Sequence, residues 1–227
     1  MTGPSPSGAG AAPTKPRGPR LYVILDRTVA GGRDLVAILE AAIEGGAEMI
    51  QLREKTWPSG QVYPLAQRLR ARCGAASVPF IVNDRVDLAV AVEADGVHLG
   101  QDDLPPEAAR KLLGRAAIIG FSTHDLEQAF EASTLPINYL AIGPIFETGT
   151  KANPDPAVGI EGIRTVRSVV GDLTLVAIGG ITAENAREVL AAGADSVAVI
   201  SALVSDADAI TRRTANLIRH LRNRTPD

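Results

Sequence analysis

The feature that most constrains the fold of this chain is an eightfold alternation of short apolar runs with segments of helical pattern. The apolar runs predict strands at residues 21–25, 47–52, 79–82, 94–99, 117–120, 139–143, 173–178 and 196–200. The helical patterns follow them at residues 34–44, 61–72, 86–92, 105–113, 125–132, 161–170, 183–192 and 207–221. Near-continuous apolar strands that alternate with helices are typical of a parallel sheet covered on both faces.

Eight strand–helix units most economically close into a single α/β domain of the (β/α)8 TIM-barrel type, near the lower size limit of that fold. The alternative is a doubly wound open sheet, which normally carries a G-x-G-x-x-G turn after its first strand. The segment from Leu21 to Arg27 has no such turn. We predict a TIM-barrel catalytic domain over residues 20–227, preceded at residues 1–19 by a disordered tail rich in Pro, Gly, Ser and Ala.

The composition argues against several classes of protein. Aromatic residues make up 4% of the chain and the net charge is -3, so neither base stacking nor a basic surface for nucleic acid is expected. No apolar run reaches the ~18 residues of a membrane-spanning helix. Cys73 is the only cysteine, which excludes an intrachain disulfide, and it reads as a small buried hydrophobic residue. We predict a cytoplasmic protein that binds small molecules rather than nucleic acid or membrane.

Two acidic residues follow two neighbouring predicted strands. Residues 79–103 contain the third and fourth strands, and Asp84 and Asp103 lie just beyond their ends. Ligand sites of parallel α/β folds lie beyond the carboxyl ends of strands, and carboxylate oxygens suit Mg²⁺ that also binds substrate phosphates. The pattern predicts a Mg²⁺–phosphate site at these two residues. The alternative is that both cap the helices that follow, at Val86 and at residues 105–106.

Cationic residues follow the second predicted strand. By strand alternation, Gln51, Arg53 and Lys55 share one face. Two cations at a strand end suit a polyanion, because Arg offers a bidentate fork and Lys a point charge. The alternative is a charged turn in solvent. Trp57 lies farther along the same loop, where it could contact a substrate or cover the rim of the barrel.

Three polar residues and an interior histidine belong to the fourth and fifth units. Ser122 could donate a hydrogen bond to a phosphate oxygen, and Thr123 could cap the next helix. His124 could be an acid or base, but it reads more simply as a structural hydrogen-bonding residue. His98 lies inside the fourth predicted strand, and we interpret it as a packed or hydrogen-bonded interior residue.

The loop at residues 144–158, after the sixth predicted strand, is long for a compact barrel. It contains glycine and several hydroxyl groups and includes Lys151. Hydroxyl and backbone N–H groups near a lysine suit phosphate capture, and a loop of this length is usually a lid or binding loop. The alternative is a plain linker.

A second phosphate site is predicted at the seventh and eighth strands. Gly179 and Gly180 follow the seventh strand and would let a phosphate approach bare backbone, with Ser201 opposite them after the eighth. Two anion sites at one opening, one of them with Mg²⁺, suggest a diphosphate leaving group and a phosphorylated acceptor.

Together these segments resemble a known family, thiamine phosphate synthase. The resemblance covers residues 20–205 and rests on motifs in family order: QLREK (51–55), VNDRVDLA (82–89), GVHLGQDDLP (96–105), the turn at residues 120–122, GPIFETGTK (143–151), AIGGIT (177–182) and VISAL (199–203). It implies that a pyrimidine diphosphate and a thiazole phosphate are joined to thiamine phosphate by a dissociative mechanism. It also implies a Mg²⁺ cofactor and a homodimer.

The resemblance carries roles to matching positions only. It implies that the pyrimidine diphosphate is held by Gln51, Arg53, Lys55, Asn83, Ser122 and Lys151, of which Arg53, Lys55, Ser122 and Lys151 are the catalytic candidates. It implies Mg²⁺ at Asp84 and Asp103. For the thiazole phosphate it implies Thr148, Gly149, Thr150, Gly180, Ile200 and Ser201. Residues 56–63, residues 152–156 and the tail before Arg20 have no residue-by-residue match.

Two other functions are compatible with parts of this pattern. A thiazole tautomerase is a related barrel that handles only the thiazole, and it would be expected to lack the full diphosphate set, which is present here. A non-catalytic barrel could bind thiazole phosphate as a regulatory signal. The intact pair Asp84 and Asp103 argues against that second reading.

Overall fold

The computed structural model describes residues 20–148, 156–201 and 209–222. Eight parallel strands form a closed barrel in sequence order, and the last strand pairs with the first. The predicted TIM barrel is therefore confirmed, while the tail predicted at residues 1–19 lies outside the described residues. The strands are β1 (Leu21–Asp26), β2 (Met49–Arg53), β3 (Phe80–Asn83), β4 (Gly96–Leu99), β5 (Ile118–Thr123), β6 (Tyr139–Ile142), β7 (Thr174–Ile178) and β8 (Ser196–Val199).

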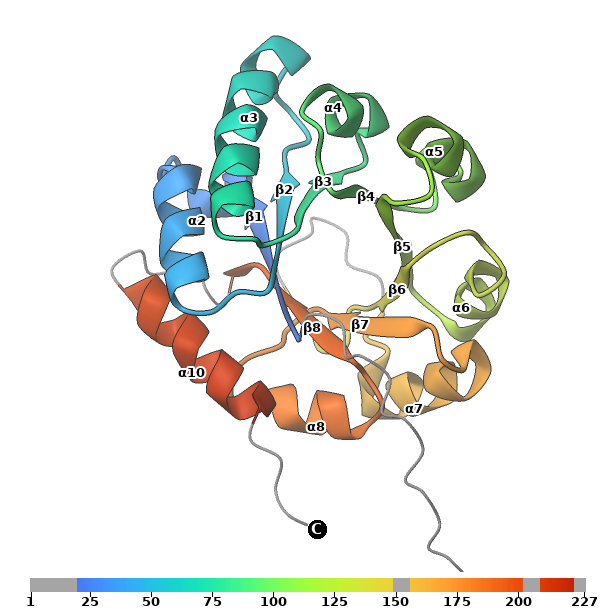
Figure 1. Cartoon of the computed structure of the whole chain (residues 1–227). Helices are drawn as coiled ribbons and strands as arrows, with labels where there is room; N and C mark the ends of the chain where they lie inside the picture. Colours follow the sequence, from blue (N-terminus) through green and yellow to red (C-terminus); the bar gives the residue numbers. More distant parts are fainter. Residues whose placement is uncertain (1–19, 149–155, 202–208, 223–227) are drawn as a thin grey trace, which may run out of the picture.

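Helices surround the barrel as an outer ring (Figure 1). They are α1 (Arg27–Ala30), α2 (Leu35–Glu44), α3 (Ser59–Ala75), α4 (Val86–Ala91), α5 (Pro106–Leu113), α6 (Leu126–Ala132), α7 (Gly159–Val170), α8 (Ala186–Ala191) and α10 (Ile210–Arg222). Within the described ranges, none of the helices has the length and apolar character needed to cross a membrane. The short helix α1 was not predicted, and it forms because the Asp26 side chain accepts a hydrogen bond from Val29 N at 3.0 Å.

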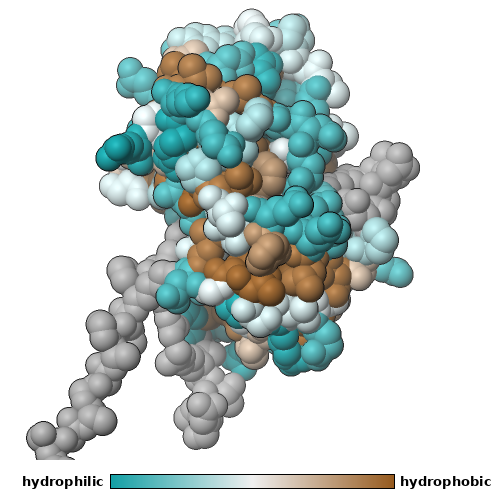
Figure 2. Space-filling view, turned by 90° about the vertical axis from the view of Figure 1, so that its right-hand side faces the viewer, coloured by the Kyte–Doolittle hydropathy of each residue, from teal (hydrophilic) through white to brown (hydrophobic). Residues whose placement is uncertain are grey.

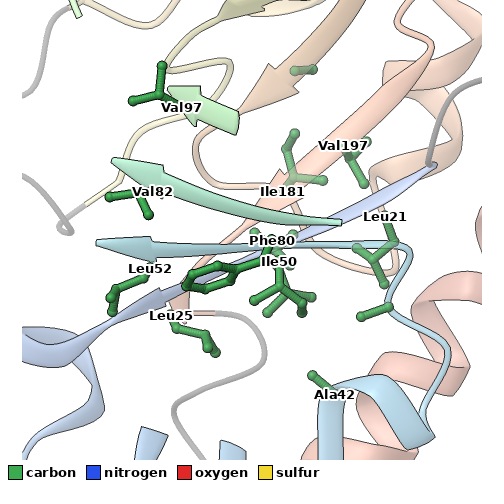
Figure 3. Packing of buried hydrophobic residues seen from close by; sticks show 14 of the residues in the cluster. Leu21, Leu25, Ala42, Ile50, Leu52, Phe80, Val82, Val97, Ile181 and Val197 are labelled. Carbon is green, nitrogen blue, oxygen red and sulfur yellow. The ribbon is translucent and has the colours of Figure 1, made fainter. Parts of the chain in front are cut away.

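Strand alternation divides the apolar residues into two layers. The larger layer lies between the strands and the helices; Leu52, Phe80 and Val82 belong to it and gather on one side of neighbouring strands (Figure 3). The smaller layer fills the inside of the barrel, with Tyr22 and Tyr139 as its largest members. Both layers must be filled at once, which is why the strands contain few polar residues except near their carboxyl ends.

Cys73 of α3 belongs to the larger apolar layer, as expected from the sequence. Burial raises the pKa of its thiol to about 12, with the Arg70 charge opposing this and the Asp95 charge adding to it. The thiol therefore stays protonated at neutral pH, and Cys73 acts as a hydrophobic residue.

The fifth strand differs most from its prediction. It was expected to end at Gly120, with a turn beyond it, but β5 continues to Thr123 because Ser122 and Thr123 pair with Ala141 and Ile142 of β6. The suggestion that Thr123 could cap the next helix is wrong. Its hydroxyl donates to the Ala141 carbonyl at 3.0 Å, and Asp125 caps α6 instead.

The outer surface carries exposed apolar side chains on α5 and α6. Figure 2 shows apolar residues gathered on this side of the barrel, bordered by polar ones. Leu112 of α5 is 63% exposed and Phe130 of α6 is 62% exposed, with Leu126 one helical turn before Phe130. Exposed apolar patches are surfaces that self-association can cover. The homodimer implied by the resemblance stays a prediction.

Gly120 makes room inside the barrel for the Tyr139 ring, because a Cβ atom at this position would lie 2.0 Å from Tyr139 Cζ. We expect Gly120→Ala to lower the free energy of unfolding by about 1–3 kcal/mol through overpacking. Urea denaturation measures this change. The control is Gly60→Ala in α3, where an added Cβ meets nothing within 4 Å. Equal stability of the two variants would contradict the close contact.

Candidate active site at the carboxyl ends of the strands

Asp84 and Asp103 meet at the ends of β3 and β4. Asp84 N donates to the His98 carbonyl at 2.8 Å, and its backbone is left-handed with φ 61°. Asp103 is held by its own turn, where Gly100 N donates to Asp103 Oδ2 at 2.7 Å. The two carboxyl groups lie within hydrogen-bonding reach of each other. A left-handed backbone at a residue other than glycine costs free energy and often marks a functional position.

The capping alternative for these two residues is wrong. The N-cap of α4 is Arg85 and the N-cap of α5 is Pro105, and neither helix receives a side-chain capping bond. Asp84 precedes its helix by one residue too many, and the Asp103 carboxylate turns back toward Gly100. Helix capping therefore explains neither carboxyl group.

The charge of Asp84 is only partly compensated. Burial raises the pKa of its carboxyl group, and the neighbouring Asp103 carboxyl raises it further. Lys55 opposes both effects, since its Nζ lies 3.1 Å from Asp84 Oδ2. The pKa of Asp84 remains above its ordinary value. A further cation near this pair would stabilise the ionised form.

The three residues predicted to share a face at the end of β2 do so, and each has a polar partner inside the opening. Arg53 pairs with Asp26, its register partner on β1. Lys55 reaches Asp84, although its side chain is 53% exposed. The alternative of a charged turn in solvent therefore does not describe Arg53, and it describes Lys55 only in part. Sequence reasoning missed Asp26, whose role depends on the register of two strands.

A buried chain of hydrogen bonds crosses the barrel interior beneath the opening. Gln51 Nε2 donates to the Tyr22 hydroxyl at 2.6 Å, and the Tyr22 and Tyr139 hydroxyls are 3.0 Å apart. The Tyr139 hydroxyl lies 2.9 Å from His98 Nδ1, and His98 Nε2 lies 2.8 Å from Ser122 Oγ. This chain joins Gln51 to Ser122, two residues that the family resemblance placed in one ligand site.

One direction of donation satisfies the whole chain. Gln51 donates to Tyr22, Tyr22 to Tyr139, and Tyr139 to His98 Nδ1, which leaves His98 Nε2–H to donate to Ser122 Oγ. The Ser122 hydroxyl hydrogen is then available to an acceptor in the opening. Burial raises the pKa of both tyrosines, so both stay neutral and able to donate.

His98 is thus the hydrogen-bonded interior residue that the sequence indicated, stacked at 5.5 Å on the Tyr139 ring. Tyr22 and Tyr139 were not among the predicted site residues. Their signal was present in the sequence, because they are two of the three tyrosines of an aromatic-poor chain and lie in predicted strands. Asn83, opposite His98 in the pairing of β3 and β4, is also buried.

The loop after β6 is joined to the end of β7. Ile145 N donates to the Ile178 carbonyl at 2.9 Å, and Phe146 N donates to the Gly179 carbonyl at 3.1 Å. These bonds fix the start of the loop at the carboxyl end of β7, and the described part of the loop continues to Thr148. Gly149, Thr150 and Lys151, all predicted in ligand sites, lie outside the described residues.

Gly180 has a left-handed backbone with φ 66°, and its carbonyl accepts from Asn185 Nδ2 at 3.0 Å. A Cβ at Gly180 would lie 2.7 Å from Phe146 Cβ, so only glycine lets the two loops approach this closely. Ile200 and Ser201 directly follow β8, which pairs with β7. The topology therefore gathers the described members of the predicted thiazole site at the same opening as Asp84.

Two remaining residues have structural partners. His124 Nδ1 lies 2.7 Å from the Gly143 carbonyl oxygen, in agreement with the structural interpretation of this histidine. Trp57 lies on the rim, where the Arg27 guanidinium stacks 4.4 Å from the centroid of its ring.

Comparison with known proteins identifies the family. A family model described as thiamine monophosphate synthase matches residues 21–203. The chain is 48% identical over 202 residues to a thiamine-phosphate synthase from Methanospirillum hungatei, a match that covers 88% of this chain and 98% of that relative. It is 43% identical over 206 residues to one from Moorella thermoacetica, with 90% and 98% covered.

Among solved structures, the thiamine phosphate pyrophosphorylase from Pyrococcus furiosus resembles the barrel with a TM-score of 0.80 at 39% identity. The match covers 89% of this chain and 95% of that structure. The family model and relatives above 40% identity along nearly their whole length agree with this likeness. The chain therefore belongs to the thiamine-phosphate synthase family and is a transferase.

Proposed function

We propose that this enzyme joins 4-amino-2-methyl-5-hydroxymethylpyrimidine diphosphate to 4-methyl-5-(2-hydroxyethyl)thiazole phosphate, or to its carboxylated form. The products are thiamine phosphate and diphosphate, and the carboxylated acceptor would release CO2 as well. The observation that carries the proposal is the adjacency of Asp84, Asp103 and Lys55 at one opening, in a chain of this family. The cytoplasmic location predicted from the sequence is part of the same proposal.

Mg²⁺ is the proposed cofactor, with Asp84 and Asp103 as its protein ligands. The fit rests on two adjacent carboxyl groups, one of which has its pKa raised by burial and by the other. Among the described residues, no group of three or more His, Cys, Asp or Glu side chains could hold a metal. Such a two-carboxylate site suits Mg²⁺, which is usually bound through one or two carboxylates plus substrate phosphates. When bound, the ion would neutralise negative charge on the departing diphosphate.

Residues at and just beyond the end of β2, with others from the opening, would bind the pyrimidine diphosphate. Arg53 and Lys55, with Lys151, would bind the diphosphate oxygens. Gln51, Asn83 and Ser122 would hold the pyrimidine half, with the buried hydrogen-bond chain fixing the orientations of Gln51 and Ser122. In the dissociative mechanism the C–O bond breaks first, and the diphosphate keeps the bonding electron pair. Such a reaction needs fixed charges more than a general base.

The second substrate would bind across the opening. Gly180, Ile200 and Ser201, with Thr148, Gly149 and Thr150, are the proposed thiazole phosphate residues. The left-handed Gly180 and its close approach to Phe146 support this placement. The thiazole nitrogen would then attack the pyrimidine-stabilised methylene cation and complete the new C–N bond.

The two alternatives make different demands on the acidic pair. A thiazole tautomerase or a regulatory thiazole-phosphate barrel has no need of half-buried adjacent carboxyl groups beside a lysine. The purified protein mixed with both substrates and Mg²⁺ is expected to release diphosphate and form thiamine phosphate, which chromatography detects. Absence of both products would favour the tautomerase or the regulatory barrel over the proposed function.

Asp84→Asn tests the metal site through stability as well as activity. A raised pKa means that ionised Asp84 destabilises the metal-free fold above that pKa, and this cost is relieved as the pH falls through it. We therefore expect the variant to melt at a higher temperature than the parent without metal, yet to gain less from Mg²⁺. Turnover should fall ~100-fold, as for loss of one charge-stabilising group.

The control for that variant is Asp87→Asn in α4. Asp87 is paired with Arg85, which lowers the pKa of Asp87, so removing its charge should not raise the melting temperature. The Mg²⁺ response of the control should equal that of the parent. A full Mg²⁺ response in Asp84→Asn would exclude Asp84 as a ligand.

Ser201→Ala tests the acceptor site. The loss of one hydroxyl should raise KM for the thiazole phosphate about 10- to 150-fold, given about 1.5–3 kcal/mol for a hydrogen bond to a charged group. KM for the pyrimidine diphosphate should stay within about twofold. Steady-state kinetics with each substrate varied in turn measures both, and the reverse pattern would mean that the two sites are exchanged.

A further inference from the structure

Two ion pairs join the ends of β1 and β2. In one pair the acidic residue comes from the β1 side, and in the other it comes from the β2 side. Asp26 and Arg53 are register partners on the two strands, and they pair on the face that looks into the barrel. One residue farther along, Arg27 pairs with Glu54. The dipeptides Asp26-Arg27 and Arg53-Glu54 therefore carry opposite charge orders. Because neighbouring side chains alternate in direction, the Asp26–Arg53 pair faces the opening and the Arg27–Glu54 pair lies on the opposite side of the strand ends.

Glu54, in the Arg27–Glu54 pair, accepts most of the hydrogen bonds on that side. Its side chain is only 2% exposed. Glu54 Oε1 accepts from Thr56 N at 2.5 Å, from the Thr56 hydroxyl at 2.7 Å and from Trp57 N at 2.9 Å. Glu54 Oε2 accepts from Arg27 Nε. The carboxylate thus closes the turn that follows β2 and ties that turn to α1.

Arg27 completes the arrangement from the β1 side. Its Nη2 donates to the Thr56 hydroxyl at 3.1 Å, and its guanidinium lies 4.4 Å from the centroid of the Trp57 ring. We call Arg27, Glu54, Thr56 and Trp57 the rim clasp. Burial acts to raise the pKa of Glu54, but the hydrogen bonds from Thr56, Trp57 and Arg27 outweigh it and hold the pKa at about 2. Glu54 is therefore ionised at any pH where the protein would work.

The rim clasp lies on both sides of Lys55 in the sequence. Lys55 follows Glu54 and precedes Thr56, and its Nζ reaches 3.1 Å from Asp84 Oδ2. Arg53 precedes Glu54 and is held by Asp26. The turn that Glu54 closes therefore contains the backbone of Lys55 and starts next to Arg53, whose own backbone is paired with Asp26 on β1. A long lysine side chain on an open turn would sample many directions, at a cost in entropy on binding.

We infer that Glu54 and Arg27 are positioning residues, which hold Arg53 and Lys55 in place for the diphosphate of the first substrate. This inference rests on the proposed function, because it assigns a purpose to the two cations that the proposal places on the diphosphate. An ordinary exposed ion pair contributes ~0–1 kcal/mol to stability and would not affect a substrate constant. Glu54 differs from such pairs, because it is buried and bonds to the backbone of the turn itself.

Glu54→Gln is the principal test. The Gln side chain has nearly the shape of Glu but lacks the charge that binds Arg27. We expect kcat/KM for the pyrimidine diphosphate to fall ~10- to 100-fold, since small misplacements of binding groups have effects of this size. KM for the thiazole phosphate should change by less than about twofold. Arg27→Gln should show the same fall in kcat/KM for the pyrimidine diphosphate and the same small change in KM for the thiazole phosphate. The double variant should lose little more kcat/KM than either single variant, because both residues act through the rim clasp.

Trp57 provides a direct readout, because it is the only tryptophan of the chain. Loss of the clasp should change its emission maximum and increase its quenching by acrylamide in both single variants. The matched control is Glu40→Gln, which breaks an ion pair with Arg72 at 3.0 Å between α2 and α3. Those helices belong to the same two strand–helix units, so the control should leave both the kinetics and the fluorescence unchanged.

Binding of inorganic diphosphate with Mg²⁺, followed by calorimetry, separates this inference from the proposed function. If the parent protein makes no thiamine phosphate, the proposed function fails, yet Glu54→Gln must still bind diphosphate at least ~10-fold more weakly for the clasp to stand. Suppose instead that the parent is active and the variant melts at a lower temperature, but its kcat/KM for the pyrimidine diphosphate and its affinity for diphosphate equal those of the parent. The rim clasp is then merely structural, and the inference is overturned. Should Glu54→Gln not fold, Arg27→Gln decides between the same outcomes.

Discussion

The pairing of β8 with β1 is the constraint on which the rest of this structure depends. Closure of the sheet brings the carboxyl ends of all eight strands to one opening, so that residues as distant in sequence as Arg53 and Ser201 face a common space. It also gives each strand two buried faces of different size. The outer face packs on helices, and the inner face must fill a narrow interior where a single ring, that of Tyr139, needs a glycine opposite it.

The buried hydrogen-bond chain explains why its own polar groups can lie inside the barrel at low cost. Gln51, Tyr22, Tyr139, His98 and Ser122 each find a partner in the next member of the chain, so no member loses its hydrogen bonds on leaving water. A fully satisfied network is also stiff, because moving one member breaks bonds at both of its ends. Displacing Gln51 or Ser122 beneath the opening would therefore break hydrogen bonds inside the barrel.

The alternation of apolar runs was sufficient to predict the closed barrel and, apart from the end of β5, the strand ends that gather at its opening. The order of the motifs was sufficient to predict the family. What could not be predicted depends on pairing between strands. The Asp26–Arg53 pair follows from a register that no single segment displays, and Glu54 becomes the centre of a turn only once Arg27 is beside it. Ser122 and Thr123 looked like turn residues because their pairing with β6 is a tertiary effect.

The long loop after β6 begins and ends at one place on the barrel. Val158 N donates to the Pro144 carbonyl at 2.8 Å, and Gly159 N donates to the Ile145 carbonyl at 3.0 Å, so the outgoing and returning segments are bonded to each other. At such a neck, changes in loop length add only a small closure entropy. Evolution can consequently lengthen, shorten or rewrite this segment without refolding the barrel. Relatives built on the same neck would be free to diverge in the molecules that they accept.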